Sequence, residues 1–426
     1  MKGSGSIAPG SINLRRGFAT AFAVGTLLWT AATFQGAQNG ASSANSKTAS
    51  ANSLGAETKR IPRSDHLGDE ACARCHQEKT NSYAKTAHHL TSQFASSNAI
   101  LGSFGPGVNT MQTSNPNLTF RMDAKGDEFF QTAIWGTLPN QRTHTQRFDL
   151  VIGSGRNGQT YLFWDENQLF QLPVGYSAVL GRWINSPGYQ DGTASFARGI
   201  VPRCLECHAT YFEPQFTDPD SNFYNKTNFV LGISCERCHG PGREHVQSYE
   251  TNKDGSTGPV GVSERRMVNP AKLSRALQLD ICAQCHAGPG EREMVSTFSY
   301  LPGQPLSPYI DLGSNDSAKD VDVHGKQVKL LMKSKCFQAS PDMSCVTCHD
   351  VHKPESALAS STQRCLNCHK SEASGGHAKI GREVATNCIE CHMPILETKV
   401  VELDLNGKKI RPRLRTHWIK IYSEGR

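Results

Sequence analysis

The chain has 426 residues, with 15 cysteines, 16 histidines and a formal net charge of +7. Its mean hydropathy of −0.47 excludes a polytopic membrane protein, and because it has no run of five or more like charges, we expect no nucleic-acid partner. A hydrophobic share of 37% is low for a large globular enzyme but too high for a disordered chain.

Residues 1–37 have the composition of an export segment. Arg15 and Arg16 precede an apolar stretch at 17–34, and small residues follow it. This order is typical of a Sec-type signal peptide, although the stretch is also long enough for an N-terminal membrane anchor. Both interpretations place the remaining chain in the periplasm or otherwise outside the cytoplasm. Residues 38–64 are rich in Ser, Ala and Asn, and predict a flexible linker.

Fourteen of the cysteines form seven Cys-x-x-Cys-His motifs, numbered here in chain order. The motifs are Cys72/Cys75/His76, Cys204/Cys207/His208, Cys235/Cys238/His239, Cys282/Cys285/His286, Cys345/Cys348/His349, Cys365/Cys368/His369 and Cys388/Cys391/His392. In a c-type haem site the two thiols bond to the vinyl groups of one haem, and the adjacent histidine binds the iron. Zinc ribbons and disulfide frameworks need no histidine after each second cysteine. The sequence therefore predicts seven covalently bound c-type haems.

Residues 65–426 leave roughly 50 residues for each motif, too few for seven separate cores. We expect one seven-haem domain here, mainly α with few regular elements and organised around a shared haem core. Short helices are expected to carry the motifs, at 69–92, at 361–372 and around motif 7. The long gap after motif 1 predicts a small β-rich insert at about 105–175. Within it we expect a strand at 148–152 and a hairpin formed by 160–164 and 168–172.

Nine histidines lie outside the motifs and are candidates for the second axial position of the irons. A histidine three or six residues after a motif cannot easily reach the far face of that motif's own haem. His352 follows His349 by three residues, and His245 follows His239 by six. Both should therefore bind the iron of a neighbouring haem.

The surroundings of these histidines carry a family resemblance. Tyr83-Ala-Lys-Thr-Ala-His88 follows motif 1, Gly-Pro-Gly-Arg-Glu-His245 follows motif 3, and Met393-Pro394 follows motif 7. Over about 65–420 the chain resembles the multihaem cytochromes related to cytochrome c-554, the cytochrome c-552/4 domain group. The resemblance implies a set of distal metal ligands: His88, His245, His352 and His377, extended by His324 and His417. For the seventh haem His66, His89, His144 or a methionine remain, or its sixth position is open.

We expect an extracytoplasmic electron-transfer cytochrome whose haems are mostly bis-His, with other cytochromes or a quinol-linked membrane complex as redox partners. One alternative is a multihaem oxidoreductase with an open haem acting on hydroxylamine or a small nitrogen or sulfur oxyanion, and Arg156, Tyr161 and His144 are its candidate polar groups. Another is a haem subunit of a membrane redox complex, anchored by residues 17–34. The carrier is favoured over the catalyst. Cys336, outside all motifs, is either a reactive thiol or a small buried apolar residue.

Overall fold

The computed structural model describes residues 60–250, 267–288, 292–313, 321, 325–355, 358–369, 387–398, 402–405 and 407–422. The chain divides into two units, Met1–Leu54 and Gly55–Arg426, and all of the described residues belong to the second. The expected export segment, nearly all of the linker, His324 and His377 lie outside the described residues. Among the residues described, no helix is both long and apolar enough to cross a membrane.

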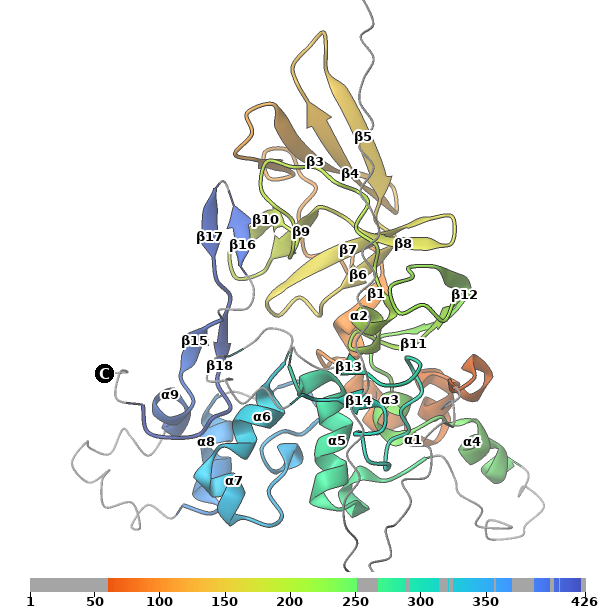
Figure 1. Cartoon of the computed structure of the whole chain (residues 1–426), viewed down its shortest axis with the longest axis vertical. Coiled ribbons are helices and arrows are strands. Elements are labelled where there is room, and N and C mark those ends of the chain that lie inside the picture. The colour runs from red at the N-terminus through yellow and green to blue at the C-terminus, as the bar shows by residue number, and fades with distance from the viewer. Residues whose placement is uncertain are drawn as a thin grey trace, which may run out of the picture. The chain divides into compact units, whose positions relative to one another are not determined.

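Two antiparallel sheets occupy the long gap between motifs 1 and 2 (Figure 1). The first sheet has the order β2-β3-β4-β5, with strands β2 (Thr110–Gln112), β3 (Leu118–Lys125), β4 (Glu128–Trp135) and β5 (Arg142–Arg147). The second has the order β1-β6-β7-β9-β10, and β8 pairs with β7. Its strands are β1 (Ser92–Phe94), β6 (Leu150–Ile152), β7 (Gly158–Asp165), β8 (Gln168–Gln171), β9 (Val174–Ser177) and β10 (Arg182–Asn185).

Alternating side chains and tight turns explain these strands. Along β3, Leu118, Phe120 and Met122 are buried on one face, which is the period-two pattern of a half-buried strand. Gly126, with φ 61°, supplies the left-handed conformation of the turn that joins β3 to β4. The buried faces of the strands meet in one apolar core that includes Phe148 and Tyr161.

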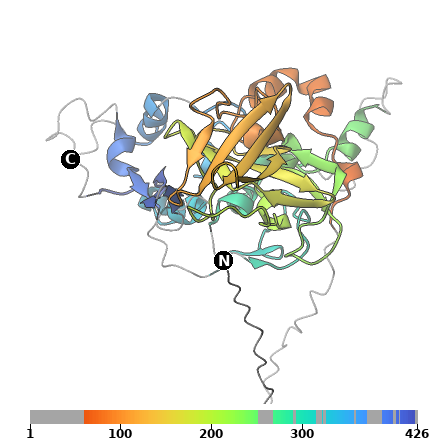
Figure 2. The ribbon, with the colours of Figure 1, turned by 90° about the horizontal axis from the view of Figure 1, so that it is seen from above.

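The motifs lie in short helical segments on one side of the two sheets, as Figures 1 and 2 show. The segments that carry them are α1 (Asp69–Tyr83), α2 (Pro202–Glu206), α3 (Cys235–His239), α5 (Arg275–His286), the 3-10 turn η4 (Cys345–Thr347), α8 (Leu358–Leu366) and α9 (Cys388–His392). The other helices are α4 (Arg243–Glu250), α6 (Gln327–Met332) and α7 (Lys335–Ala339), with 3-10 turns η1 (Arg63–Asp65), η2 (His89–Thr91) and η3 (Pro270–Lys272).

In the described residues, four two-stranded sheets lie between and after the motifs. They pair β11 (Ala209–Pro214) with β12 (Tyr224–Leu231), β13 (Arg292–Glu293) with β14 (Ile310–Asp311), β15 (Ile395–Glu397) with β18 (Arg413–Arg415), and β16 (Leu403–Leu405) with β17 (Lys408–Ile410). The β11–β12 hairpin packs against the second sheet in a separate apolar cluster with Leu150 and Leu162. This cluster joins the β region to α2, which carries motif 2.

The expectation of a mainly α domain is wrong. Strands account for 28% and helices for 25% of the structure, which is mixed and contains a sizeable antiparallel β region. The helix expected at 69–92 ends at Tyr83, and the helix expected at 361–372 is α8, which ends at Leu366. The helices are short because a covalent haem motif needs only about one turn of helix to place its cysteines and histidine. Most of the apolar side-chain core therefore comes from strands.

Candidate haem sites

Thiol contacts bring motifs from distant parts of the chain together. In three places a cysteine of one motif lies within hydrogen-bonding contact of a cysteine of another: Cys72 with Cys235, Cys207 with Cys285, and Cys282 with Cys345. Looser electrostatic contacts connect further motifs: Cys238 with Cys282, Cys348 with Cys368, and Cys365 with Cys388. The seven attachment points thus form one continuous group.

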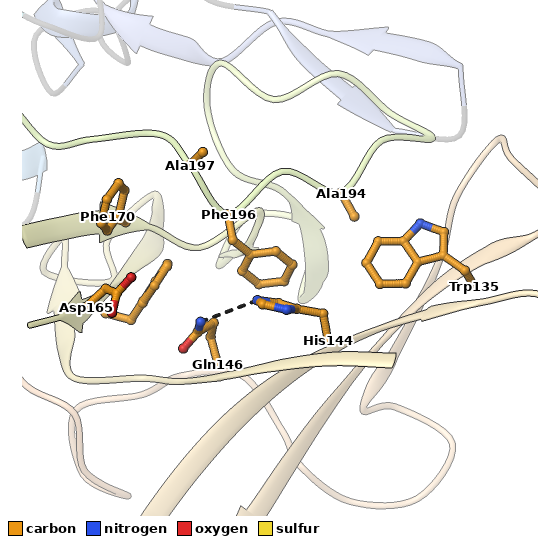
Figure 3. Close-up of a pocket in the computed structure, with 9 residues that line it drawn as sticks. Trp135, His144, Gln146, Asp165, Phe170, Ala194, Phe196 and Ala197 are labelled. Carbon is orange, nitrogen blue, oxygen red and sulfur yellow. Dashed lines mark hydrogen bonds between the residues drawn. The ribbon is translucent and has the colours of Figure 1, made fainter. Parts of the chain in front are cut away.

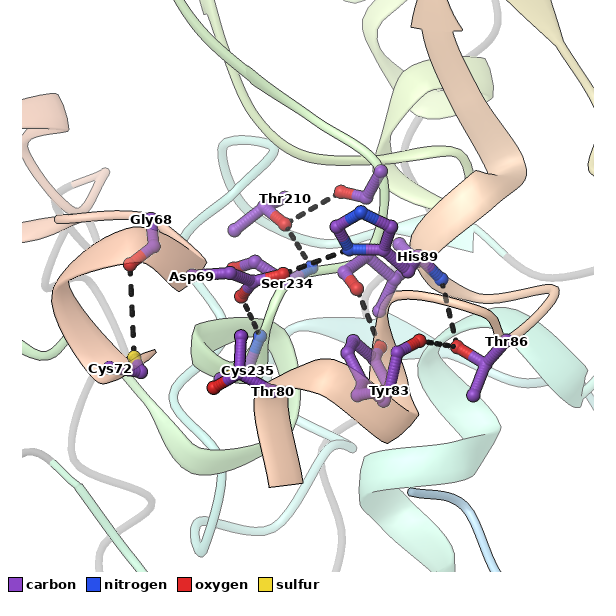
Figure 4. Close-up of polar contacts among 12 residues, drawn as sticks. Gly68, Asp69, Cys72, Thr80, Tyr83, Thr86, His89, Thr210, Ser234 and Cys235 are labelled. Atoms are coloured by element: carbon purple, nitrogen blue, oxygen red, sulfur yellow. Dashed lines mark hydrogen bonds and ion pairs between the residues drawn. The ribbon is translucent and has the colours of Figure 1, made fainter. Parts of the chain in front are cut away.

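A polar network fixes motif 1 against motif 3 (Figure 4). Asp69, at the start of α1, accepts a hydrogen bond from the backbone N–H of Cys235 at 2.9 Å and contacts Nδ1 of His89 at 2.9 Å. Burial opposes ionisation of Asp69, but these two hydrogen bonds hold the pKa of its carboxyl below the usual value. At the other end of α1, the hydroxyl of Tyr83 donates to the carbonyl of Ile233 at 2.5 Å. His89 therefore anchors the segment that carries His88.

Three imidazole pairs among the described residues have the separation that a shared iron requires. The ring centroids of His88 and His286 lie 6.0 Å apart, as do those of His239 and His352, and those of His349 and His417 lie 6.1 Å apart. Iron bonded to one imidazole nitrogen on each side, at about 2 Å, places the two centroids roughly 6 Å apart. Each pair joins a motif histidine to one of the predicted distal histidines. These residues fit haem iron.

Hydrogen bonds orient the motif histidines. Nδ1 of His239 contacts the carbonyl of Val268 at 2.9 Å, and Nδ1 of His392 contacts that of Lys420 at 3.0 Å. Nδ1 of His286 contacts Oε1 of Gln327 at 3.2 Å. A partner on Nδ1 fixes the ring and leaves Nε2 for the metal.

His208 of motif 2 is held in the same way, by the start of the second sheet. Its Nδ1 lies 3.1 Å from Oγ1 of Thr91, and its carbonyl accepts a hydrogen bond from the hydroxyl of Ser92 at 2.6 Å. The sequence predicted His208 as an iron ligand but gave no sign of these contacts, because Thr91 and Ser92 lie more than 100 residues away along the chain. Motif 2 is therefore attached directly to β1.

Eight motif residues are exposed in the structure rather than enclosed by the polypeptide. They are Cys75 and His76 of motif 1, Cys204 of motif 2, Cys348 and His349 of motif 5, Cys368 and His369 of motif 6, and Cys391 of motif 7. His76 also departs from helical geometry within α1, at φ −116° and ψ 40°. In the part of the chain that the structure describes, no second imidazole faces His76 or His369.

The distal histidines have the protonation state that a metal ligand needs. Burial, together with a smaller effect of nearby motif histidines, lowers the pKa of both His88 and His417 to about 4. Both imidazoles are therefore neutral at pH 7, which is the form that coordinates iron.

The remaining histidines occupy different surroundings. His245 lies on α4 with its ring 5.0 Å from that of Tyr249. His66 is buried beside Tyr211, and its Nδ1 lies 3.3 Å from the carbonyl of Pro62. His89 is held by Asp69. Within the described ranges, neither His66 nor His89 faces a motif histidine across a 6 Å gap.

His144 lies in a cleft between the two sheets (Figure 3). Its ring centroid is 4.4 Å from that of Phe196, and its Nε2 lies 3.4 Å from Nε2 of Gln146. The cleft measures about 430 Å³, and Trp135 and Asp165 contribute to its lining. No lining residue belongs to a haem motif, so the structure places His144 away from the attachment points.

The candidate catalytic groups Arg156, Tyr161 and His144 occupy separate places. Tyr161 is fully buried in the β core, and its hydroxyl donates to Oε1 of Gln159 at 3.2 Å. Arg156 forms an ion pair with Glu355, in the segment that follows motif 5. The three groups therefore do not converge on one site.

The sequence interpretation missed a buried charge cluster around Glu206. This carboxylate forms ion pairs with Arg203 and Arg237. Its members lie beside and between the cysteines of motifs 2 and 3, but nothing in the sequence indicates that they are buried together.

Comparisons with known proteins identify the class of protein. Residues 190–240, which contain motifs 2 and 3 up to Gly240, match the family model described as cytochrome c554 and c-prime. The chain is a multihaem c-type cytochrome. This cytochrome is 21% identical over 404 residues to the dissimilatory sulfite reductase MccA of Wolinella succinogenes. The alignment covers 78% of the cytochrome and 51% of that protein, so the chain spans about half the length of its curated relative.

One solved structure is also similar to the cytochrome. It is the outer cell wall cytochrome OcwA, with a TM-score of 0.49 and 15% sequence identity. The superposition covers 84% of the cytochrome and 80% of OcwA.

Proposed function

We propose that the protein is an extracytoplasmic electron carrier with seven covalently bound haems c, most of them held between two histidines. The observation that carries the proposal is the set of three imidazole pairs at 6.0–6.1 Å. Haem iron held in this way changes oxidation state with little rearrangement and has no free position for substrate. The extracytoplasmic location is supported by the c-type motifs and by the match to a cytochrome c family.

The proposed distal ligands follow from the pairs. His352 serves motif 3, His88 serves motif 4 and His417 serves motif 5. His245, His324 and His377 remain for the other motifs. Each assigned ligand comes from a segment far from the motif it serves, so ligation would also hold the fold together.

The thiol contacts support an order for the electron path. Motif 1 neighbours motif 3, and Cys238 of motif 3 lies near Cys282 of motif 4. Motif 4 then meets motif 5, and the path continues through motifs 6 and 7, while motif 2 joins at motif 4. Such a path has ends at motifs 1, 2 and 7, where redox partners would dock. Those partners would be other cytochromes or a quinol-linked membrane complex.

A second candidate function is favoured by the relative named a dissimilatory sulfite reductase. In that case one motif would hold a haem with an open sixth position, and the substrate would be a small sulfur or nitrogen compound. Motifs 1 and 6 are the first sites to examine, because His76 and His369 are exposed and face no second imidazole within the described ranges.

The optical spectrum of the dithionite-reduced protein, with and without carbon monoxide, separates the two functions. The carrier proposal expects a low-spin c-type spectrum that the gas leaves unchanged. A Soret change equivalent to about one haem in seven would overturn it, because such a change requires an exchangeable sixth ligand. Turnover assays with sulfite, nitrite and hydroxylamine would then follow.

Haem stoichiometry provides an independent prediction. We expect the mass of the purified protein to exceed that of its polypeptide by seven haems, and the pyridine haemochrome assay to give seven haems per chain. The Cys336→Ser variant is the matched control, and it should retain all seven because Cys336 belongs to no motif. A smaller number in the wild-type protein would contradict the prediction that every motif carries a haem.

The inclination of the ring pairs predicts two kinds of ferric electron paramagnetic resonance signal. The rings of His88 and His286 are nearly perpendicular, at 81°, whereas the other two pairs are inclined at 26° and 27°. Perpendicular imidazoles leave the iron orbitals nearly degenerate and give a highly anisotropic low-spin signal, while near-parallel rings give a rhombic one. We expect both signals, and the His88→Ala variant should lose only an anisotropic component.

A further inference from the structure

A buried charge cluster lies where motifs 2, 3 and 4 meet. Arg203 directly precedes Cys204, Glu206 lies between the cysteines of motif 2, and Arg237 lies between those of motif 3. Nη1 of Arg203 is 2.9 Å from Oε2 of Glu206, and Nη2 of Arg237 is 3.6 Å from Oε1. The side chains of Glu206 and Arg237 are only 5% and 7% exposed. We call these three residues the Arg203–Glu206–Arg237 cluster.

Further hydrogen bonds attach the cluster to the backbone of the motifs. Arg203 donates to the carbonyl of Gln284 in motif 4 at 2.8 Å, and Gln284 donates to the carbonyl of Arg237 at 3.3 Å. Arg237 also donates to the carbonyl of Glu206 at 3.0 Å, and the thiol of Cys285 lies 3.8 Å from the same carbonyl. The charges therefore lie directly against three haem-attachment segments.

One residue that contacts the cluster has a strained backbone conformation. Phe298 has φ 59°, a left-handed conformation that is rare for a bulky residue. In this conformation its backbone N–H donates to Oε1 of Glu206 at 2.5 Å, and its buried ring lies 5.5 Å from Cζ of Arg237. Such strain persists only where the surrounding contacts hold it in place.

A second carboxyl contacts the cluster without adding charge to it. Glu293 is hydrogen-bonded to Glu206, and burial together with the Glu206 charge raises the pKa of Glu293 to about 8. Burial also opposes ionisation of Glu206, but the two guanidinium groups hold the pKa of that carboxyl below its usual value. The two ion pairs of Glu206 thus place two cations and one carboxylate in the cluster.

We propose that the Arg203–Glu206–Arg237 cluster sets the reduction potentials of the haems attached at motifs 2, 3 and 4. Reduction adds an electron to the iron, so a nearby cation favours it and a nearby carboxylate opposes it. In a buried cluster these charges are poorly screened by water and salt. The inference rests on the proposed function, because it requires haems at these three motifs. The three residues are positioning residues that act through the haems.

The test is an optical redox titration of three holoprotein variants at pH 7. Glu206→Gln, combined with Glu293→Gln so that Glu293 cannot ionise in its place, removes the carboxylate and should move part of the titration curve, up to three haems in seven, to more positive potential. Arg237→Gln removes a cation and should move the same part to more negative potential. The control Glu128→Gln deletes an equal charge beside Arg147 on the exposed surface of the β region, and should leave the curve unchanged.

The opposite signs distinguish charge from mere packing. A cluster that only holds the motifs together would give shifts of the same sign in both variants, or none, and either result would overturn the proposal. If Glu206→Gln does not incorporate its haems, two other variants are measured. Arg203→Gln removes a cation and should move the curve to more negative potential. The double variant Glu206→Gln/Arg237→Gln removes one charge of each sign, so its curve should lie near that of the wild type. Haem stoichiometry is measured on every sample: fewer than seven haems in the wild type refutes the proposed function, whereas seven haems with unshifted potentials refutes this inference alone.

Discussion

The His88→Ala variant is expected to convert one haem of the protein to a form that binds carbon monoxide. His88 faces His286 of motif 4 at 6.0 Å, and its pKa is lowered by burial and by the neighbouring His286 and His349. Alanine offers no nitrogen to the iron, so the sixth position would pass to water or an added ligand. We expect a Soret change equivalent to about one haem in seven in the carbon monoxide difference spectrum, against none in the wild type.

His144→Ala is the matched control for this experiment. It also removes a histidine outside the motifs, but His144 lies in the cleft between the two sheets with Phe196 and Gln146. Its spectrum should match that of the wild type with and without the gas. An unchanged spectrum for His88→Ala, or an equal change for His144→Ala, would show that the imidazole pairs do not identify the distal ligands.

The haem motifs could be recognised from sequence alone because their chemistry is local. Two thiols and a histidine within five residues form one attachment site, whatever the rest of the fold does. The distal ligands are different, because His88 and His286 meet only after long loops have closed. Family resemblance and the neighbouring residues predicted His88, His352 and His417 as distal ligands. Only the folded chain shows which motif histidine each of them faces.

The β content was underestimated for a physical reason. Strand alternation at 118–135 lies within the expected insert, but the haem motifs dominated the interpretation of the remaining chain as helix and loop. The structure continues the strands through β11 and β12 to Leu231 and adds short hairpins between and after the later motifs. Pairings such as that of Ser92 with Ile152 join strands far apart in sequence, and local patterns carry little information about them.

The Arg203–Glu206–Arg237 cluster escaped the sequence interpretation for a related reason. A charged residue between two motif cysteines is usually expected to face solvent. The sequence therefore gave no sign that Glu206 and Arg237 are buried. They become buried only because motifs 2, 3 and 4 converge. Burial of an ionic group thus depends on tertiary contacts that no single motif encodes.

The Phe120→Ala substitution is expected to destabilise the β region by about 3–5 kcal/mol. Phe120 is fully buried on β3, in the core that contains Met122, Phe148 and Tyr161. Because these neighbours are closely packed, they cannot move enough to fill the cavity that loss of the ring would leave. The midpoint of urea unfolding, followed by far-UV circular dichroism, should therefore fall by about 1 M or more. Phe94→Ala is the control, because Phe94 is 64% exposed; its midpoint should change far less.

This variant also tests how strongly the sheets and the haem motifs are coupled. The core around Phe120 contains no motif residue, whereas the neighbouring cluster that includes Leu205 connects the second sheet to α2. We therefore expect Phe120→Ala to keep all of its haems and a low-spin optical spectrum at urea concentrations where its far-UV circular dichroism signal from the strands is already reduced. Simultaneous loss of both signals would show instead that the sheets and the haem-bearing helices unfold as one cooperative unit, with the Leu205 cluster transmitting the defect.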